Sequence, residues 1–241
     1  MMRFLDDQFA PVTFSMGFVE ASFSQYSQAF VSWWEKLSID FETTPFEEDL
    51  RSALLRLQPL QSPQNRYLLV ETKSPWTALF SNGLRTADVS SPVGHLCQVL
   101  NCRGLEVTCI PDRSHLEDKK DALRIYGAVG FTLLGPQPTD SLNRVRSIWA
   151  MNDGGHWKFI SEGIVQPYEH VERYTSRKIS ERFTPEMLES YCEALGIKLY
   201  NEGFYGPKGL LVNQLTKFPQ TSPRVSINEA RAHLYLSQGS G

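Results

Sequence analysis

The sequence predicts an α+β fold, in which helices pack beside a mixed, largely antiparallel sheet. Two observations predict this class. Segments with alternating apolar and polar residues follow one another directly. Of three helix starts with a hydroxyl residue before proline, two lie between these segments and one follows the last of them. A parallel, doubly wound sheet would require regular alternation of strands and helices, which the sequence does not show. We expect four to six helices.

The first two helices are predicted from apolar spacing and from a capping box. Residues 20–37 carry one stripe of large apolar side chains at helical spacing, formed by Phe23, Tyr26, Phe30, Trp33 and Leu37. The segment Thr44-Pro45-Phe46-Glu47 is typical of a capping box with proline at the first helical position. A helix is therefore expected to begin within about two residues of Thr44.

Two later helices begin with the same pattern. Ser91-Pro92 and Thr184-Pro185-Glu186 each place a hydroxyl residue before a proline, whose missing N–H needs no partner in the first turn. Gly196 follows the last apolar position of the second of these helices and suits a left-handed C-cap. Helices should therefore begin near Ser91 and Thr184.

The strands are predicted from alternation and from β-branched or aromatic content. The segments are residues 12–18, 66–71, 76–80, 105–109, 125–134, 145–151 and 156–160. The last two flank Asp153-Gly154-Gly155, which suits a three-residue hairpin loop with glycine in the left-handed position. This register places Trp157 opposite Met151 and Phe159 opposite Trp149, so Trp149 and Phe159 are expected on one face.

One domain over residues 1–236 is the preferred organisation. A charged connector at residues 112–121 allows an alternative with two similar lobes, 1–111 and 122–236, although no residue-level repeat is visible. Residues 237–241 are expected to be a frayed tail. The length allows a large core without disulfides or a metal.

Charge and hydropathy exclude several classes of protein. The 24 Lys and Arg against 27 Asp and Glu leave a net charge of −3, which does not suit a nucleic-acid partner. The longest apolar runs are far shorter than a membrane span, and the N-terminus does not resemble a signal peptide, so we expect no membrane partner and a cytoplasmic protein. The four cysteines form no CxxC pair, and we expect no metal and no cofactor.

The segment 169–182 contains several basic residues, as a nucleic-acid-binding stripe would. Its basic residues alternate with acidic ones, and Glu169 and Arg173 have the i, i+4 spacing of a helical ion pair. The pattern predicts a solvated helix face.

No catalytic residue is assigned, because the sequence contains no GxSxG, GxxxxGK[ST], GxGxxG or HExxH motif. Two features keep an enzymatic alternative open. His156, between Gly155 and Trp157, could act as an acid or a base. The loop from Asn82 to Asp88, which includes Arg85, lies at a strand–helix junction where ligands often bind. The candidate ligand-loop residues are Asn82, Arg85 and Asp88.

Three features are candidate contacts for a protein partner. The adjacent Trp33 and Trp34 point about 100° apart on a helix, so one ring is exposed unless the helix is covered over a wide arc. His156 and Trp157 lie near a hairpin tip, and an acidic cluster occupies a predicted first helical turn. The complete set is Trp33, Trp34, Glu47, Glu48, Asp49, His156 and Trp157.

Two stretches carry a resemblance to a known group. Residues 76–88, beginning Trp76-Thr77-Ala78-Leu79-Phe80, and residues 182–205, beginning Arg182-Phe183-Thr184-Pro185-Glu186, resemble segments of uncharacterised bacterial proteins. That group is associated with immunity to polymorphic or contact-delivered toxins. The resemblance implies a mildly acidic, single-domain cytoplasmic binder without a cofactor, and it assigns no catalytic residue.

The function expected from these observations is that of a non-enzymatic, cytoplasmic binding protein of the immunity type, which neutralises a cognate toxin by protein–protein interaction. One alternative is a small hydrolase or transferase that uses His156 or the loop from Asn82 to Asp88. Another is a structural subunit that oligomerises through an aromatic face. The sequence leaves the oligomeric state open.

Overall fold

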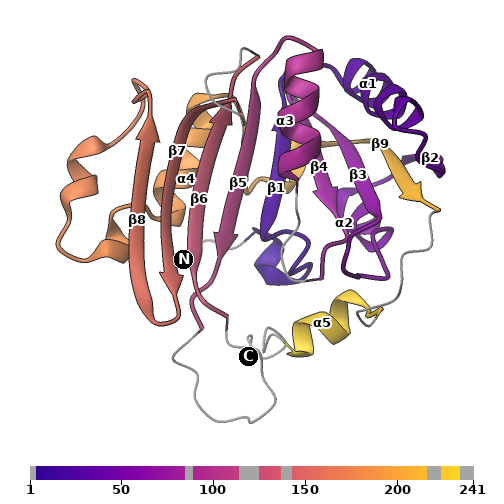
Figure 1. Ribbon diagram of the computed structural model, residues 1–241. Coiled ribbons are helices and arrows are strands. Elements are labelled where there is room, and N and C mark those ends of the chain that lie inside the picture. The colour runs from indigo at the N-terminus through magenta and orange to yellow at the C-terminus, as the bar shows by residue number, and fades with distance from the viewer. Residues whose placement is uncertain (1–3, 85–88, 114–124, 137–142, 216–223, 234–241) are drawn as a thin grey trace.

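The computed structural model of the chain describes residues 4–84, 89–113, 125–136, 143–215 and 224–233 (Figure 1). The strands are β1 Ser15–Val19, β2 Phe41–Glu47, β3 Arg66–Thr72, β4 Thr77–Ser81, β5 Gly104–Ile110, β6 Ala128–Leu134, β7 Arg144–Asp153, β8 His156–Gly163 and β9 Tyr205–Gln214. The α-helices are α1 Phe23–Lys36, α2 Leu50–Leu55, α3 Ser90–Val99, α4 Pro185–Ala194 and α5 Ile227–His233. Short 3₁₀ helices are η1 Phe4–Asp7, η2 Val171–Thr175, η3 Ile179–Glu181 and η4 Glu202–Phe204.

The nine strands of the described residues form one antiparallel sheet in the order β2-β9-β3-β4-β1-β5-β6-β7-β8. The α+β prediction is confirmed. Strand β9, from the C-terminal part of the chain, lies between β2 and β3, so the sheet combines strands from both sides of the charged connector. Whether residues 1–236 form one domain stays a prediction.

Helices cover the two faces of the sheet unequally. Figure 1 shows α3 in front of the sheet and α4 behind it. On the α3 side, the buried side chains of α1 are Tyr26, Phe30 and Trp34, and they pack with Val93 and Leu96 of α3. Burial of each such side chain contributes roughly 1.5–3 kcal/mol, which accounts for the position of α1 across β3.

The larger part of the core lies on the other face. Helices α2, α4 and α5 all contribute to it, with Leu54, Leu188 and Ile227 as examples. Trp76 is fully buried there, and its indole Nε1 donates to the carbonyl of Leu195 at the end of α4, at 2.9 Å. This bond ties the β3–β4 hairpin to α4.

Two predicted helix starts are confirmed. Helix α3 begins at Ser90, one residue before the expected start. Helix α4 begins at Pro185, and the Thr184 hydroxyl accepts from the backbone N–H of Met187. Gly196 follows α4 with φ +81°, as expected for a left-handed C-cap glycine.

The helix predicted near Thr44 is wrong. Residues 41–47 form strand β2, which pairs with β9 along its whole length, and α2 begins only at Leu50 after Asp49 as its N-cap. Pro45 is tolerated because β2 is an edge strand. It has a neighbouring strand on one side only, so the N–H that proline lacks is not needed for hydrogen bonds to a second strand. Pairing with a distant strand overrides the local capping signal.

The predicted hairpin is present, but the predicted pairing of its two strands differs from the observed register by one residue. The turn contains only Gly154 and Gly155, both with positive φ, and Asp153 pairs with His156. A two-residue turn with two positive φ values matches the right-handed twist of the strands. Because side chains alternate along a strand, the shift places Trp149 and Phe159 on opposite faces of the sheet.

The charged segment after β8 also differs from its prediction. It forms η2 and η3 instead of a solvated α-helix, and the side chain of Glu169 is fully buried. None of the helices in the described part of the chain has the length and apolarity that crossing a bilayer requires.

Candidate binding site

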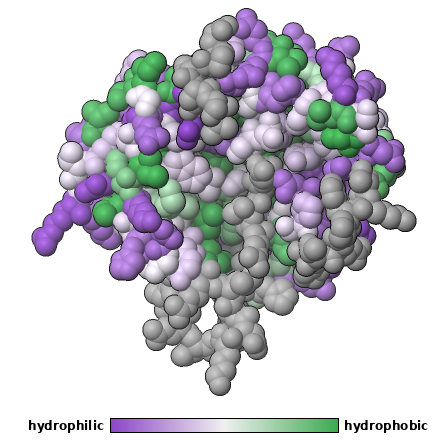
Figure 2. Space-filling view, in the orientation of Figure 1, coloured by the Kyte–Doolittle hydropathy of each residue, from purple (hydrophilic) through white to green (hydrophobic). Residues whose placement is uncertain are grey.

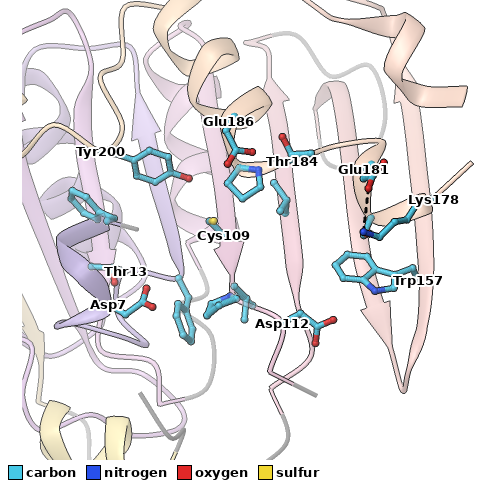
Figure 3. A pocket seen from close by; sticks show the side chains of 17 residues that line it. Asp7, Thr13, Cys109, Asp112, Trp157, Lys178, Glu181, Thr184, Glu186 and Tyr200 are labelled. Atoms are coloured by element: carbon cyan, nitrogen blue, oxygen red, sulfur yellow. Dashed lines mark hydrogen bonds and ion pairs between the residues drawn. The ribbon is translucent and has the colours of Figure 1, made fainter. Parts of the chain in front are cut away.

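A cavity of about 310 Å³ lies at one end of the α4 side of the sheet (Figure 3). Its walls come from the end of β5, the start of β6, Trp157 of β8, η3, the first turn of α4 and the N-terminal segment. Phe4, Phe14, Ile110 and Val129 make much of the surface apolar. The volume is at the lower end of the range for ligand pockets, which suits one small group.

Acidic residues dominate the charge of this cavity, which we call the acidic cavity. It is lined by Asp7, Asp112, Glu181 and Glu186, against Lys178 as the one basic residue among the described lining. Lys178 already pairs with Glu181 at 3.1 Å. The formal charge of the described lining is therefore negative.

Asp7 is the most deeply placed of these acids, with 8% of its surface exposed. It belongs to η1, and Figure 3 shows its carboxyl group pointing toward the interior of the cavity. Glu186 reaches the cavity from the first turn of α4, behind the N-cap Thr184. Carboxyl groups from two distant segments thus line one largely apolar cavity.

In Figure 3 the thiol of Cys109 lies between the carboxyl groups of Asp7 and Glu186, beside the hydroxyl end of Tyr200. Burial raises the pKa of Cys109, and the neighbouring charges of Asp7 and Glu186 raise it further. Burial likewise raises the pKa of Tyr200, with Cys109 as the next cause. Both groups stay protonated at neutral pH, and a protonated thiol is a poor nucleophile. The arrangement can hold a cation, but it does not activate a cysteine.

Of the three acids predicted as a partner contact, Glu48 and Asp49 form contacts within their own segment of the chain. Glu48 forms a bidentate ion pair with Arg56. Asp49 accepts from the backbone N–H of Ser52 at 3.0 Å, and this bond is the main cause of its lowered pKa. Glu47 is exposed at the end of β2 and lies outside the cavity lining. The structure therefore gives Glu48 and Asp49 structural contacts.

Neither predicted tryptophan of α1 presents a free ring. Trp34 is 3% exposed. Trp33 is half-buried and packs against the imidazole of His95, with ring centroids 4.9 Å apart. The helix is covered over the wide arc that burial of adjacent residues requires.

His156 and Trp157 are separated by the pleat of β8. His156 is exposed beside the turn, whereas Trp157 is half-buried and lines the acidic cavity. Of the residues predicted to bind a partner, Trp157 is the one that the structure places in this cavity.

Asn82 of the predicted ligand loop is fully buried and saturated with hydrogen bonds. Its Oδ1 accepts from the backbone N–H groups of Asn65 and Arg66, both at 2.9 Å. Its Nδ2 donates to the carbonyl of Pro59 and to Oδ1 of Asn65. Asn82 therefore has no hydrogen-bonding group left for a ligand, and Arg85 and Asp88 lie outside the described residues.

Sequence reasoning missed most of the cavity. The alternation in residues 105–109 predicts a strand and Thr184-Pro185-Glu186 predicts a helix start, but neither pattern indicates that Cys109 and Glu186 line one cavity with Asp7 and Tyr200. Among the described residues, no group of three or more His, Cys, Asp or Glu side chains is placed to hold a metal ion.

Comparisons of this chain with protein-family models, curated proteins and solved structures found no match. The resemblance to immunity proteins therefore stays a prediction.

Proposed function

We propose that this chain is a non-enzymatic binding protein that takes a basic side chain of a protein partner into the acidic cavity. The proposal rests on one observation: acidic side chains and apolar side chains line the same small cavity. Lysine and arginine side chains also combine an apolar part, the stem, with a charged group at its end.

The chemistry of the cavity favours such a group. The stem packs against Trp157 and Ile110, while the head reaches the carboxyl groups of Asp7 and Glu186. Hydrogen bonds between charged groups are about twice as strong as neutral ones, and partial burial weakens competition from water. A single long side chain also suits the modest volume.

The partner that we propose is a toxin enzyme with a basic cleft, and the compartment is the cytoplasm. The net charge of −3 and the resemblance of residues 76–88 and 182–205 to immunity proteins support this class. An anchoring basic residue at the edge of a toxin's active site would let this chain block access of the toxin's substrate.

The alternatives receive less support. Cys109 is the cysteine of the cavity lining, and its raised pKa does not favour thiol catalysis. An oligomer formed through an aromatic face lacks a suitable surface, because the exposed large hydrophobic residues of the described chain are all aliphatic.

The cavity can be tested with small probes before a partner is known. We expect N-acetyl-arginine amide to bind and the uncharged N-acetyl-norleucine amide to bind at least about tenfold more weakly, as measured by calorimetry. Asp7→Asn and Glu186→Gln should each weaken binding of the arginine probe. Glu35→Gln removes an equal charge from the exposed surface of α1 and should leave binding unchanged. Equal binding of both probes would refute the cationic site.

The toxin-neutralising role needs a separate test in cells. Candidate toxins encoded beside this gene would be expressed with and without the chain, and growth would be measured. Rescue by the parent protein and by Glu35→Gln, with weaker rescue by Asp7→Asn at equal protein level, is the expected result. Equal rescue by all three proteins would show that neutralisation of the toxin does not depend on the acidic cavity.

A further inference from the structure

A second concave site lies on the opposite face of the sheet, beside α3. It is a groove of about 550 Å³, which we call the α3 groove. Its wall is α3, with His95 and Gln98, and its floor includes Thr132, Ser147 and Trp149 of β6 and β7. Figure 2 shows this side of the molecule, where polar and apolar residues are interspersed and no single apolar patch dominates.

The indole ring of Trp149 forms a flat part of the floor. It covers Gly130 on the neighbouring strand so closely that a Cβ there would lie 2.6–2.7 Å from three ring atoms. The indole Nε1 donates to Oγ1 of Thr132 at 3.3 Å, two residues further along β6. One ring face is thus held against the backbone while the residue, half-buried, lines the groove.

An unsatisfied acceptor lies in the same groove. Asn143 is 3% exposed, and its Nδ2 donates to the carbonyl of Gly94 at 3.3 Å. Its Oδ1 is buried and has no hydrogen-bond partner. Buried polar atoms are usually paired, so an orphan acceptor in a concave site points to a ligand that donates a hydrogen bond.

The charges of the groove favour an uncharged ligand. Glu106 and Arg144 carry opposite charges, and Glu106 accepts from the Ser90 hydroxyl at 2.9 Å. Partial burial and then the charge of Lys36 lower the pKa of His95, so its imidazole is neutral at pH 7. The described lining therefore has no net charge.

We propose that the α3 groove binds a neutral sugar ring. A pyranose presents an apolar C–H face that can stack on Trp149, and hydroxyl groups that can donate to Oδ1 of Asn143 and exchange hydrogen bonds with the serine and threonine hydroxyls. The groove offers a flat indole for the apolar face of the sugar and neutral polar groups for its hydroxyl groups. This site is independent of the acidic cavity, which lies on the other face.

The test uses the whole chain and the methyl glycosides of glucose, galactose, mannose and N-acetylglucosamine. Saturation-transfer NMR detects binding, and calorimetry measures affinity, with dissociation constants of about 1 mM expected for single sugar rings. Trp149→Leu keeps an apolar cover over Gly130 but removes the ring. Asn143→Gly keeps the positive φ of residue 143 and removes the orphan acceptor.

Each variant has a matched control outside the groove. Phe159→Leu removes a half-buried aromatic ring from the opposite face, and Asn101→Gly changes another asparagine with positive φ. We expect Trp149→Leu and Asn143→Gly to weaken binding of the sugar at least about tenfold, and the controls to bind as the parent does. Thermal melting of all four variants identifies any loss of folding.

Three results would overturn the proposal. The first is no binding of any of the four glycosides at about 10 mM. The second is unchanged affinity in folded Trp149→Leu and Asn143→Gly. The third is stronger binding of the nucleobases adenine or cytosine, tested in parallel, because these also stack on tryptophan but lack sugar hydroxyls.

Discussion

Arg146 and Glu169 form a fully buried bidentate ion pair between β7 and the segment that follows β8. Arg146 Nε and Nη2 donate to the two carboxylate oxygens at 2.8 and 2.7 Å, and the two side chains are 2% and 0% exposed. Glu169 also accepts from the Tyr174 hydroxyl and from the backbone N–H of Gln166. Burial lowers the pKa of Arg146, but the hydrogen bonds and charge of Glu169 outweigh this effect and raise it.

Glu169→Gln should destabilise the fold by about 3 kcal/mol, because it leaves a buried guanidinium without its counter-charge. Urea denaturation measures the loss. Asp153→Asn breaks the exposed pair with Lys158 and should change stability very little, since water screens such pairs. Replacing both partners, as Arg146→Met with Glu169→Leu, should recover part of the loss; a double variant as unstable as the single one would contradict this account.

Asn82→Ala should cost about 2–4 kcal/mol of folding free energy. The substitution leaves the backbone N–H groups of Asn65 and Arg66 and the carbonyl of Pro59 without their partner. Gln98→Ala, at an exposed position of α3, should stay within about 0.5 kcal/mol of the parent. Equal stability of the two variants in chemical denaturation would show that Asn82 is free to act as a ligand residue.

Gly130→Ala should destabilise by about 1–3 kcal/mol and shift the fluorescence of Trp149, because the added methyl group displaces the indole ring. Gly94→Ala is the matched control. A Cβ there would meet only the tip of Leu134 at 4.0 Å, so a helical alanine should stabilise α3 by about 0.5–1 kcal/mol. Opposite signs for the two substitutions are the expected outcome in thermal and urea unfolding.

Stability should fall at alkaline pH. Burial raises the pKa of Cys97 to about 12 and that of Cys102 to about 11, from an ordinary value of 9.0. Groups whose pKa is higher in the folded state favour folding below the unfolded pKa, and this contribution is lost as pH rises through the folded values. The free energy of unfolding should therefore decrease from about pH 9 upward, and less steeply in a Cys97→Ala, Cys102→Ala variant. If the free energy of unfolding of the parent did not change above about pH 9, the raised pKa values of the two cysteines would be contradicted.

Local signals in the sequence predicted local structure well. The starts of α3 and α4 depend on residues within one helical turn, and both were found within the expected margin. The alternation in residues 105–109 predicted β5 for the same reason, because the pleat repeats every two residues.

Errors arose where a distant segment decides between two local possibilities. Residues 41–47 have a capping box, yet they pair with β9. Gly154 and Gly155 allow more than one turn, and the register of β7 with β8 determines the faces of Trp149 and Phe159. Glu169 has the spacing of a surface ion pair, but its partner is Arg146, on another strand.

The sequence by itself determined the α+β class, most strands and two helix starts, because propensity, capping and alternation act over a few residues. Only the tertiary structure brought Asp7, Cys109, Glu186 and Tyr200 around one cavity and laid Trp149 over Gly130. Strand order and register set those neighbours, and both depend on the burial and backbone pairing of segments far apart in the chain, which no local pattern encodes.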